Sequence, residues 1–155
     1  MFVMSIFTAV VWTVWLYFRL AKGGTCPRPV PDQNFKIEGY YGRWFEFARD
    51  ENYYQDKPCV SSDYFAVDNN MVSVNHREWS IGSTTNKGWD QYRDSFRAHC
   101  SSFVPGKCEV RPSPVVPFQA YNIMATDPDE YALIYSCTVW FGGAYKYEDF
   151  WIQTR

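Results

Sequence analysis

Five cysteines are the residues of this chain with the most specific chemistry, because they could form disulfides, bind a metal or act as nucleophiles. No two cysteines have the close spacing of a zinc ligand pair, and only His76 and His99 could assist, so we expect no metal site. Both histidines are predicted on strand surfaces. Cys100 and Cys108 flank a loop with a Pro-Gly turn signal, which makes a disulfide across this hairpin geometrically easy.

Alternating apolar and polar residues predict the strands that must position these groups. Turns rich in Asn, Asp, Gly and Pro separate the runs, and no helical period longer than one turn follows residue 22. The predicted strands are residues 42–49, 59–67, 71–79, 89–100, 108–116, 118–126, 131–139 and 145–155. Eight antiparallel strands predict an all-β, up-and-down barrel, whose interior holds one small ligand or is filled by side chains.

The composition narrows the class of partner. A length of 155 residues favours a single domain, and a net charge of −2 without a basic cluster in the predicted barrel argues against nucleic acid. Aromatic residues make up 20% of the chain, which suits pleated strands and the walls of apolar pockets. Composition alone leaves a filled core as an equal alternative to a ligand pocket.

The N-terminus carries an apolar run, residues 2–18, without a charged side chain. Its length is at the lower limit for a helix that crosses a bilayer, and Arg19 and Lys22 follow it. A cleaved signal peptide is the alternative, but no basic residue precedes the run and residues 20–23 form a poor cleavage site. We therefore predict one transmembrane anchor at residues 1–22, a Pro/Gly-rich linker at 23–34 and the barrel at 35–155.

The two ends of the predicted barrel sequence carry a tryptophan and an arginine that could meet. Trp44 lies near the start of the first strand, and Arg155 ends the last strand. If the indole lies beneath the first strand, the guanidinium can stack on its face and close one end of the barrel. A barrel that is closed at one end and open at the other can hold a ligand in its interior.

These residues also resemble the lipocalin family. Residues 42–46 are similar to its first motif, residues 125–137 to the second motif and the strand after it, and Arg155 to the third. The resemblance covers residues 26–155. The structural residues that it implies are Gly42, Trp44, Thr126, Asp127 and Arg155.

The resemblance is most specific to the branch with apolipoprotein D, the bilin-binding proteins and the bacterial lipocalins. It implies a disulfide between Cys26 and Cys137 that ties the N-terminal tail to the barrel. In apolipoprotein D-like members the cysteine equivalent to Cys59 pairs with a C-terminal cysteine. Here the sequence ends at Arg155, before the family's usual C-terminal helix. Most members are secreted, so the predicted anchor is a departure.

Strand parity and the resemblance together predict the ligand-binding residues. Trp151 shares the face of Arg155, and Asp149 follows by the period of two. Ile134 points inward if Cys137 reaches a disulfide on the outer wall. The resemblance implies that Tyr64, Tyr121 and Ile123 match positions that line the family's cavity. The predicted set is Tyr64, Tyr121, Ile123, Ile134, Asp149 and Trp151. We expect a small hydrophobic ligand, such as a lipid, sterol, retinoid or tetrapyrrole, with Asp149 as a polar anchor.

Two other functions stay open. The domain could be an accessory subunit of a larger membrane complex, with the barrel as a docking module. It could also be a thiol-dependent enzyme, which requires an unpaired Cys59 facing the cavity; Lys57 is the nearby cation in the sequence. We expect no enzyme, no catalytic residue and no cofactor apart from a bound lipophile. Disulfides place the barrel in an oxidising compartment: the mitochondrial intermembrane space, an organelle lumen or the cell exterior.

Overall fold

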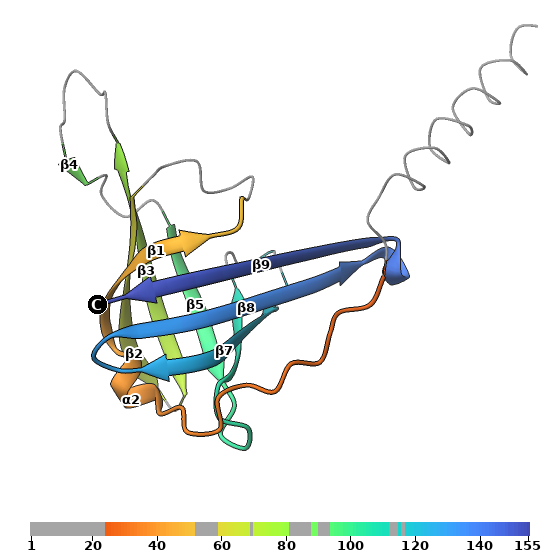
Figure 1. Ribbon diagram of the computed structural model, residues 1–155, viewed down its shortest axis with the longest axis horizontal. Coiled ribbons are helices and arrows are strands. Elements are labelled where there is room, and N and C mark those ends of the chain that lie inside the picture. The colour runs from red at the N-terminus through yellow and green to blue at the C-terminus, as the bar shows by residue number, and fades with distance from the viewer. Residues whose placement is uncertain are drawn as a thin grey trace, which may run out of the picture. The chain divides into compact units, whose positions relative to one another are not determined.

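The computed structural model describes residues 24–51, 59–68, 70–80, 88–89, 94–111, 115 and 117–155, which fall into two compact units (Figure 1). The described part of the smaller unit is residues 24–28 and 137–148, and the larger unit holds residues 29–136 and 149–155. The predicted membrane anchor, residues 1–22, lies outside the described residues. In the part of the chain that is described, no helix has the length and apolar character to cross a membrane.

The described secondary structure consists almost entirely of strands. In chain order the elements are α2 (Ile37–Tyr40), β1 (Gly42–Arg49), β2 (Val60–Asp68), β3 (Met71–Ser80), β4 (Gly88–Trp89), β5 (Asp94–Cys100), β6 (Lys107–Arg111), β7 (Gln119–Asp127), β8 (Tyr131–Trp140), the 3-10 turn η1 (Phe141–Gly143) and β9 (Tyr145–Thr154). α2 is a single helical turn directly before β1.

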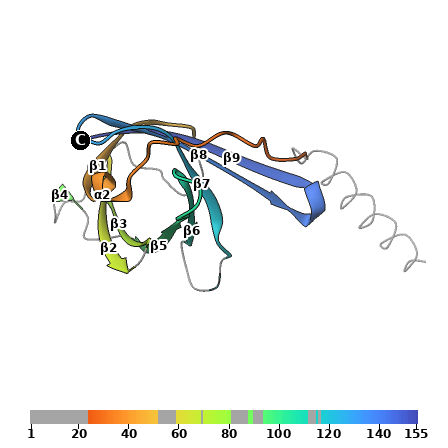
Figure 2. The same cartoon turned by 90° about the horizontal axis from the view of Figure 1, so that it is seen from below.

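The larger unit confirms the predicted barrel. Its strands follow the order β2-β1-β9-β8-β7-β6-β5-β3, and β2 also pairs with β3, so the ring of eight strands among the described residues is closed. These strands pair antiparallel with their neighbours, and in Figure 2 the strands β2, β3, β5, β6 and β7 curve round in an arc. Closure leaves no sheet edge between these strands, because each pairs on both sides.

Two of the predicted strands were wrong in extent. The run 89–100 is divided into β4 and β5, which both pair with β3. Trp89 lies opposite Trp79 and Asp94 opposite His76, so a step of five residues along this run matches a step of three along β3. Of the predicted strand 108–116, residues 108–111 belong to β6 and Val115 lies in a turn, while residues 112–114 and 116 lie outside the described residues.

Both predicted disulfides are confirmed. Cys100 and Cys108 lie opposite each other on β5 and β6, and both side chains are buried in the core of the larger unit. Within the smaller unit, Cys26 is bonded to Cys137 of β8. Two residues earlier, the Gly24 N–H donates to the carbonyl of Gly143, at a distance of 3.0 Å. The smaller unit is therefore a hairpin end with the N-terminal segment fastened along it.

Candidate functional site

One end of the barrel is closed by an indole that carries a guanidinium on its face. Trp44 has no exposed surface, and its Nε1–H donates to the carbonyl oxygen of Tyr40 at 2.9 Å. The guanidinium carbon of Arg155 lies 4.0 Å from the Trp44 ring centroid. This distance is well inside the range of a cation–π contact. The predicted meeting of the two residues is confirmed.

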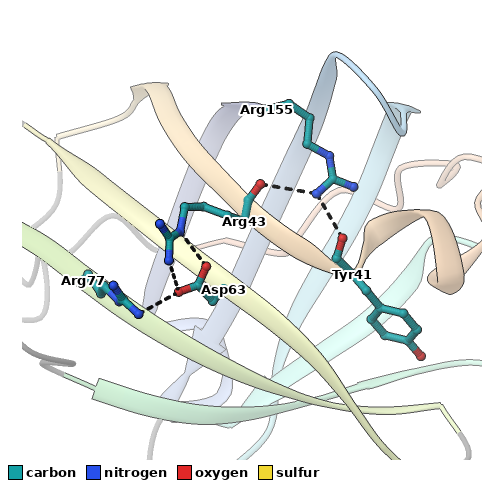
Figure 3. Close-up of polar contacts among 5 residues, drawn as sticks. All are labelled: Tyr41, Arg43, Asp63, Arg77 and Arg155. Carbon is teal, nitrogen blue, oxygen red and sulfur yellow. Dashed lines mark hydrogen bonds and ion pairs between the residues drawn. The ribbon is translucent and has the colours of Figure 1, made fainter.

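The same guanidinium also binds backbone carbonyls from three segments. It donates to Gly39 of α2 at 2.7 Å. It also donates to Tyr41 at 3.0 Å and, more weakly, to Arg43 of β1 at 3.3 Å (Figure 3). Its Nε–H donates to Pro128, in the turn between β7 and β8, at 2.7 Å. Arg155 therefore joins the last strand to the entry of the first strand and to the β7–β8 turn.

The other predicted structural residues lie around this contact. Gly42 has a φ of +101°, which strains any residue with a side chain, and a Cβ there would lie 3.1 Å from Nη1 of Arg155, so the guanidinium would have to shift slightly. The Asp127 carboxylate accepts from the backbone N–H of Asp129 at 3.0 Å and shapes the β7–β8 turn. Thr126 is half-buried; among the described residues its hydroxyl has no hydrogen-bond partner.

An ion cluster on the outer face of the barrel links strands β1, β2 and β3 near Trp44. Asp63 of β2 accepts two hydrogen bonds from Arg43 of β1, at 2.7 and 3.0 Å, and its Oδ2 lies 3.2 Å from Arg77 of β3 (Figure 3). The Asp63 carboxylate is buried, so these cations offset the cost of its desolvation. The cluster fastens three neighbouring strands in one register.

A hydrogen-bonded cluster of phenols lies on the interior side of the closed end. The Tyr64 and Tyr121 hydroxyl groups are 2.9 Å apart, and Tyr40 donates to Oε1 of Gln153 at 2.9 Å. The amide of Gln153 in turn donates to the Tyr64 oxygen at 3.2 Å. Four side chains from α2, β2, β7 and β9 thereby share one polar network in an apolar surrounding.

Burial keeps these phenols neutral. It raises the pKa of Tyr40 and of Tyr121 well above the ordinary value. The neighbouring phenols Tyr40 and Tyr64 add to the increase at Tyr121, whereas at Tyr40 the increase from Tyr64 is opposed by the hydrogen bond with Tyr121. Burial also raises the pKa of Tyr64, although its hydrogen bond with Tyr121 acts in the opposite direction. Each hydroxyl therefore keeps its proton and can donate a hydrogen bond at neutral pH.

The predicted ligand-binding residues all lie on the barrel strands, but they differ in exposed surface. Ile123 and Ile134 are partners across β7 and β8 and have no exposed surface, so in this structure they pack in the core. Tyr121 is half-buried, and the side chains that keep a small exposed fraction are Tyr64 with 4%, Asp149 with 4% and Trp151 with 8%. Asp149 and Trp151 share the interior face of β9 with Gln153, as the period of two predicts.

A second polar group lies on the interior wall formed by β2 and β3. Ser62 and His76 are opposite each other, with the hydroxyl 3.3 Å from Nδ1, and Nε2 of His76 lies 3.6 Å from a carboxylate oxygen of Glu78. All three are buried.

The predicted surface position of His76 was wrong, because His76 continues the inward face of Val72 and Val74. His99 is exposed, as predicted. In the described part of the chain, no three His, Cys, Asp or Glu side chains lie close enough together to bind a metal ion.

Next to this wall, β1 contributes an ion pair. The Arg49 guanidinium lies 3.1 Å from a carboxylate oxygen of Glu46, whose side chain is only 4% exposed. A register shift between Glu46 and Ala48 allows both charged residues to lie on one side of the strand, since an added residue reverses the alternation. Glu46 is therefore a buried carboxylate with a charged partner.

Cys59 is unpaired, since the other four cysteines, all in the described residues, form the two disulfides. Its side chain is exposed, and the buried Val60 follows it at the start of β2. A thiol-dependent enzyme requires this thiol to face the interior. Its exposure does not favour that function.

Sequence reasoning missed the polar residues of the interior. Gln153 has the parity of Trp151 and Asp149, and Glu78 has the parity of Val72 and Val74, so alternation alone was a sufficient signal for both. Tyr40 had no such signal, because it lies in a single helical turn and enters the barrel only through the fold.

Comparison of the sequence with known proteins identifies several relatives. The chain is 33% identical to apolipoprotein D of Mus musculus over 129 residues, covering 80% of this chain and 66% of that protein. It is 30% identical to apolipoprotein D of Cavia porcellus, covering 85% and 67%, and 27% identical to the Lazarillo protein of Schistocerca americana, covering 79% and 56%. The chain thus spans about two thirds or less of the length of these relatives. No protein-family model matches it.

Solved structures show the same fold. Insecticyanin from the tobacco hornworm Manduca sexta superimposes with a TM-score of 0.64 at 20% identity, over 85% of this chain and 69% of that one. Lobster apocrustacyanin A1 has a TM-score of 0.58 at 19% identity, over 83% and 72%. At these identities the likeness is evidence for the fold alone.

Proposed function

This chain belongs to the lipocalin family, and from that premise we propose that it binds one small hydrophobic molecule inside its barrel. The observation that carries the proposal is a closed ring of strands sealed at one end by Arg155 and Trp44. A ligand would then enter from the end opposite this seal. The name of the apolipoprotein D relatives, which denotes a lipid-associated protein, is consistent with a lipophilic ligand.

The side chains of the interior suit such a ligand. Aromatic surface is provided by Trp151, Tyr64 and Tyr121. Burial of an apolar ligand against these rings would contribute about 25 cal/mol to the binding free energy for each Å² of apolar surface removed from water. The neutral phenols and Asp149 offer a few polar contacts that could orient the ligand, as apolar binding sites generally require. We propose Tyr64, Tyr121, Asp149 and Trp151 as contact residues, and Ile123 and Ile134 as the apolar layer behind them.

Two measurements test the proposal on the full chain. Native mass spectrometry of the purified protein is expected to show a bound lipophile or, after delipidation, uptake of one equivalent of retinol. Retinol fluorescence should then rise with a saturable, one-to-one titration. Protein that is always empty and never binds retinol or another lipophile would contradict the function.

A pair of variants localises the site. Trp151→Leu removes an interior aromatic ring and is expected to weaken retinol binding about tenfold. The matched control is Phe47→Leu, because Phe47 is an aromatic residue of the neighbouring strand β1 whose side chain is 76% exposed. Equal loss of affinity in both variants would argue against an interior site.

We also propose that residues 1–22 hold the barrel at a membrane. The support is the uncharged run 2–18 and the basic residues that follow it. We expect the full chain to resist extraction from membranes by alkaline carbonate. Replacement of Val10 and Val11 by lysine should abolish this resistance, because each charge at the centre of a membrane-spanning helix raises the free energy of insertion by about 3 kcal/mol. A mature protein whose N-terminal sequence begins after this run would overturn the tether.

The accessory-subunit function stays a prediction. Its support is apolar surface on the outer wall, where Phe47 is 76% and Phe65 48% exposed on the paired strands β1 and β2. Native mass spectrometry of protein from its own membrane would support this function by detecting a defined protein partner. A ligand-loaded monomer would count against it.

A further inference from the structure

The end of the β8–β9 hairpin, in the smaller unit, exposes apolar side chains. Phe141 of η1 is 81% exposed, Tyr145 at the start of β9 is 41% exposed and Val139 near the end of β8 is 38% exposed. All three belong to residues 139–145, the hairpin tip, where the chain turns between the two strands (Figure 1). Apolar side chains gathered on an exposed surface mark a site of contact with a protein or a membrane.

The backbone of Phe141 has a conformation that residues with large side chains rarely adopt. Its φ is +52°, and Gly142 and Gly143 follow with φ values of +66° and +101°. Glycine adopts such angles without strain, whereas a phenylalanine there destabilises the fold. Packing within the smaller unit does not offset this strain, because most of the ring surface is exposed. A strained and exposed aromatic residue indicates a role outside the packing of the fold.

The N-terminal segment is fastened to this tip within the smaller unit. The Gly24 N–H donates to the carbonyl of Gly143 at 3.0 Å, and the Cys26–Cys137 disulfide joins the following residues to β8. Arg19, the first charged residue after the uncharged run 2–18, precedes Gly24 by five residues. Because an extended chain spans at most about 3.6 Å for each residue, Gly24 lies within about 18 Å of Arg19. A bilayer that holds the run 2–18 is therefore close to the hairpin tip.

The charge next to the tip suits the headgroups of a bilayer. Residues 1–28 carry no acidic side chain and three basic ones: Arg19, Lys22 and Arg28. The Arg28 side chain is exposed. The carboxylate of the described smaller unit is Glu148, and it forms an ion pair with Lys146. The N-terminal segment thus adds a net positive charge, which attracts lipid phosphate groups.

We propose that the hairpin tip docks on the bilayer that anchors residues 1–22, with the Phe141 ring inserted among the lipid headgroups. The inference rests on the proposed membrane tether and adds the surface of the chain that faces the lipid. Insertion removes apolar surface of Val139, Phe141 and Tyr145 from water, which is favourable. Aromatic rings are favoured at this depth, and two basic residues between the run and Gly24 lie at the headgroup level.

Photo-cross-linking of the full chain in vesicles of phosphatidylcholine and phosphatidylserine tests the inference. With p-benzoylphenylalanine in place of Phe141, we expect lipid adducts at least about tenfold more often than with the same replacement of Phe103, because a docked side chain enters the interface by about 5 to 10 Å. Phe103 is the matched control because its ring, in the larger unit, is 93% exposed and shows what exposure alone produces. Mass spectrometry counts the adducts. If the Phe141 replacement does not fold, replacement of Tyr145 must give the same excess.

The outcomes separate the docking from the tether. Equal adduct yields at positions 141 and 103, in a chain that resists carbonate extraction, overturn the inference and leave the tether intact. A full chain that does not associate with the vesicles overturns both.

A charged variant assigns the docking to the Phe141 ring. Phe141→Asp is expected to lower the yield of lipid adducts from p-benzoylphenylalanine at position 145 several-fold, because a carboxylate opposes insertion and is repelled by anionic headgroups. Phe103→Asp should leave that yield unchanged. An undiminished yield in Phe141→Asp contradicts the proposed insertion of the ring.

Discussion

The guanidinium carbon of Arg155 lies 4.0 Å above the ring of Trp44, although the two residues are separated by almost the whole length of the barrel sequence. The contact combines a fully buried indole with a guanidinium that also donates to four backbone carbonyls. The first and last strands are thereby held together at the end where the barrel closes. We therefore expect this pair to contribute both to the closed end of the proposed binding site and to the stability of the fold.

Removal of the guanidinium tests the seal. Arg155→Ala is expected to lower the free energy of unfolding by about 2 kcal/mol, because it removes the stacking contact and several charged hydrogen bonds. Arg155→Lys should recover only part of this loss, since a single ammonium cannot replace the planar fork. Chemical denaturation followed by circular dichroism measures both values. Wild-type stability in Arg155→Ala would show that the contact contributes nothing.

A methyl group at Gly42 tests the space below the guanidinium. Gly42→Ala should cost about 2 to 3 kcal/mol, because it combines a positive φ with a contact of 3.1 Å to Arg155. Gly142→Ala is the matched control: its φ is +66°, but nothing lies within 4 Å of the added carbon, so about 1 kcal/mol is expected. Equal thermal destabilisation of the two variants would contradict the steric part of the argument.

The two disulfides should contribute unequally. Cys26 and Cys137 are 111 residues apart, and the chain-entropy model assigns such a loop about 5 kcal/mol. Cys100 and Cys108 are eight residues apart, which corresponds to about 2.5 kcal/mol. Paired Cys→Ala variants measured by urea denaturation should preserve this order. The reverse order would mean that packing of the buried β5–β6 disulfide outweighs loop entropy.

The phenol cluster makes the fold sensitive to high pH. Because burial raises the pKa values of Tyr40, Tyr64 and Tyr121 in the folded state, their contribution to stability is complete below the unfolded value of about 10. It is lost as pH rises further, since the unfolded chain releases protons that the folded protein retains. Unfolding titrations between pH 8 and 12 should show this decline.

A substitution distinguishes the contribution of the phenol cluster to the loss of stability at high pH from general alkaline denaturation. Tyr64→Phe should reduce the slope of stability against pH above 10, because one buried phenol no longer titrates, while costing about 1 kcal/mol at neutral pH through the lost hydrogen bonds. Phe65→Leu, at the exposed neighbour on β2, should leave the slope unchanged. The same slope in Tyr64→Phe as in the wild type would exclude its contribution.

Much of the barrel could be predicted from the chain itself. The period of two located most strands, and it placed Trp151 and Asp149 on the inner face of β9, because successive side chains of any strand point to opposite sides. The Pro-Gly turn between Cys100 and Cys108 predicted their disulfide for an equally local reason. These features depend on neighbours in sequence, so the sequence was sufficient to determine them.

Only the tertiary structure decided which buried polar groups meet. Tyr40 joins Tyr64 and Gln153 because a helical turn, a second strand and the last strand converge at the closed end. Alternation with Val72 and Val74 was a sufficient signal for the inward face of His76, whereas its contact with Ser62 depends on the pairing of β3 with β2. Contacts between distant segments follow from strand closure and register, and no local pattern of residue types specifies them.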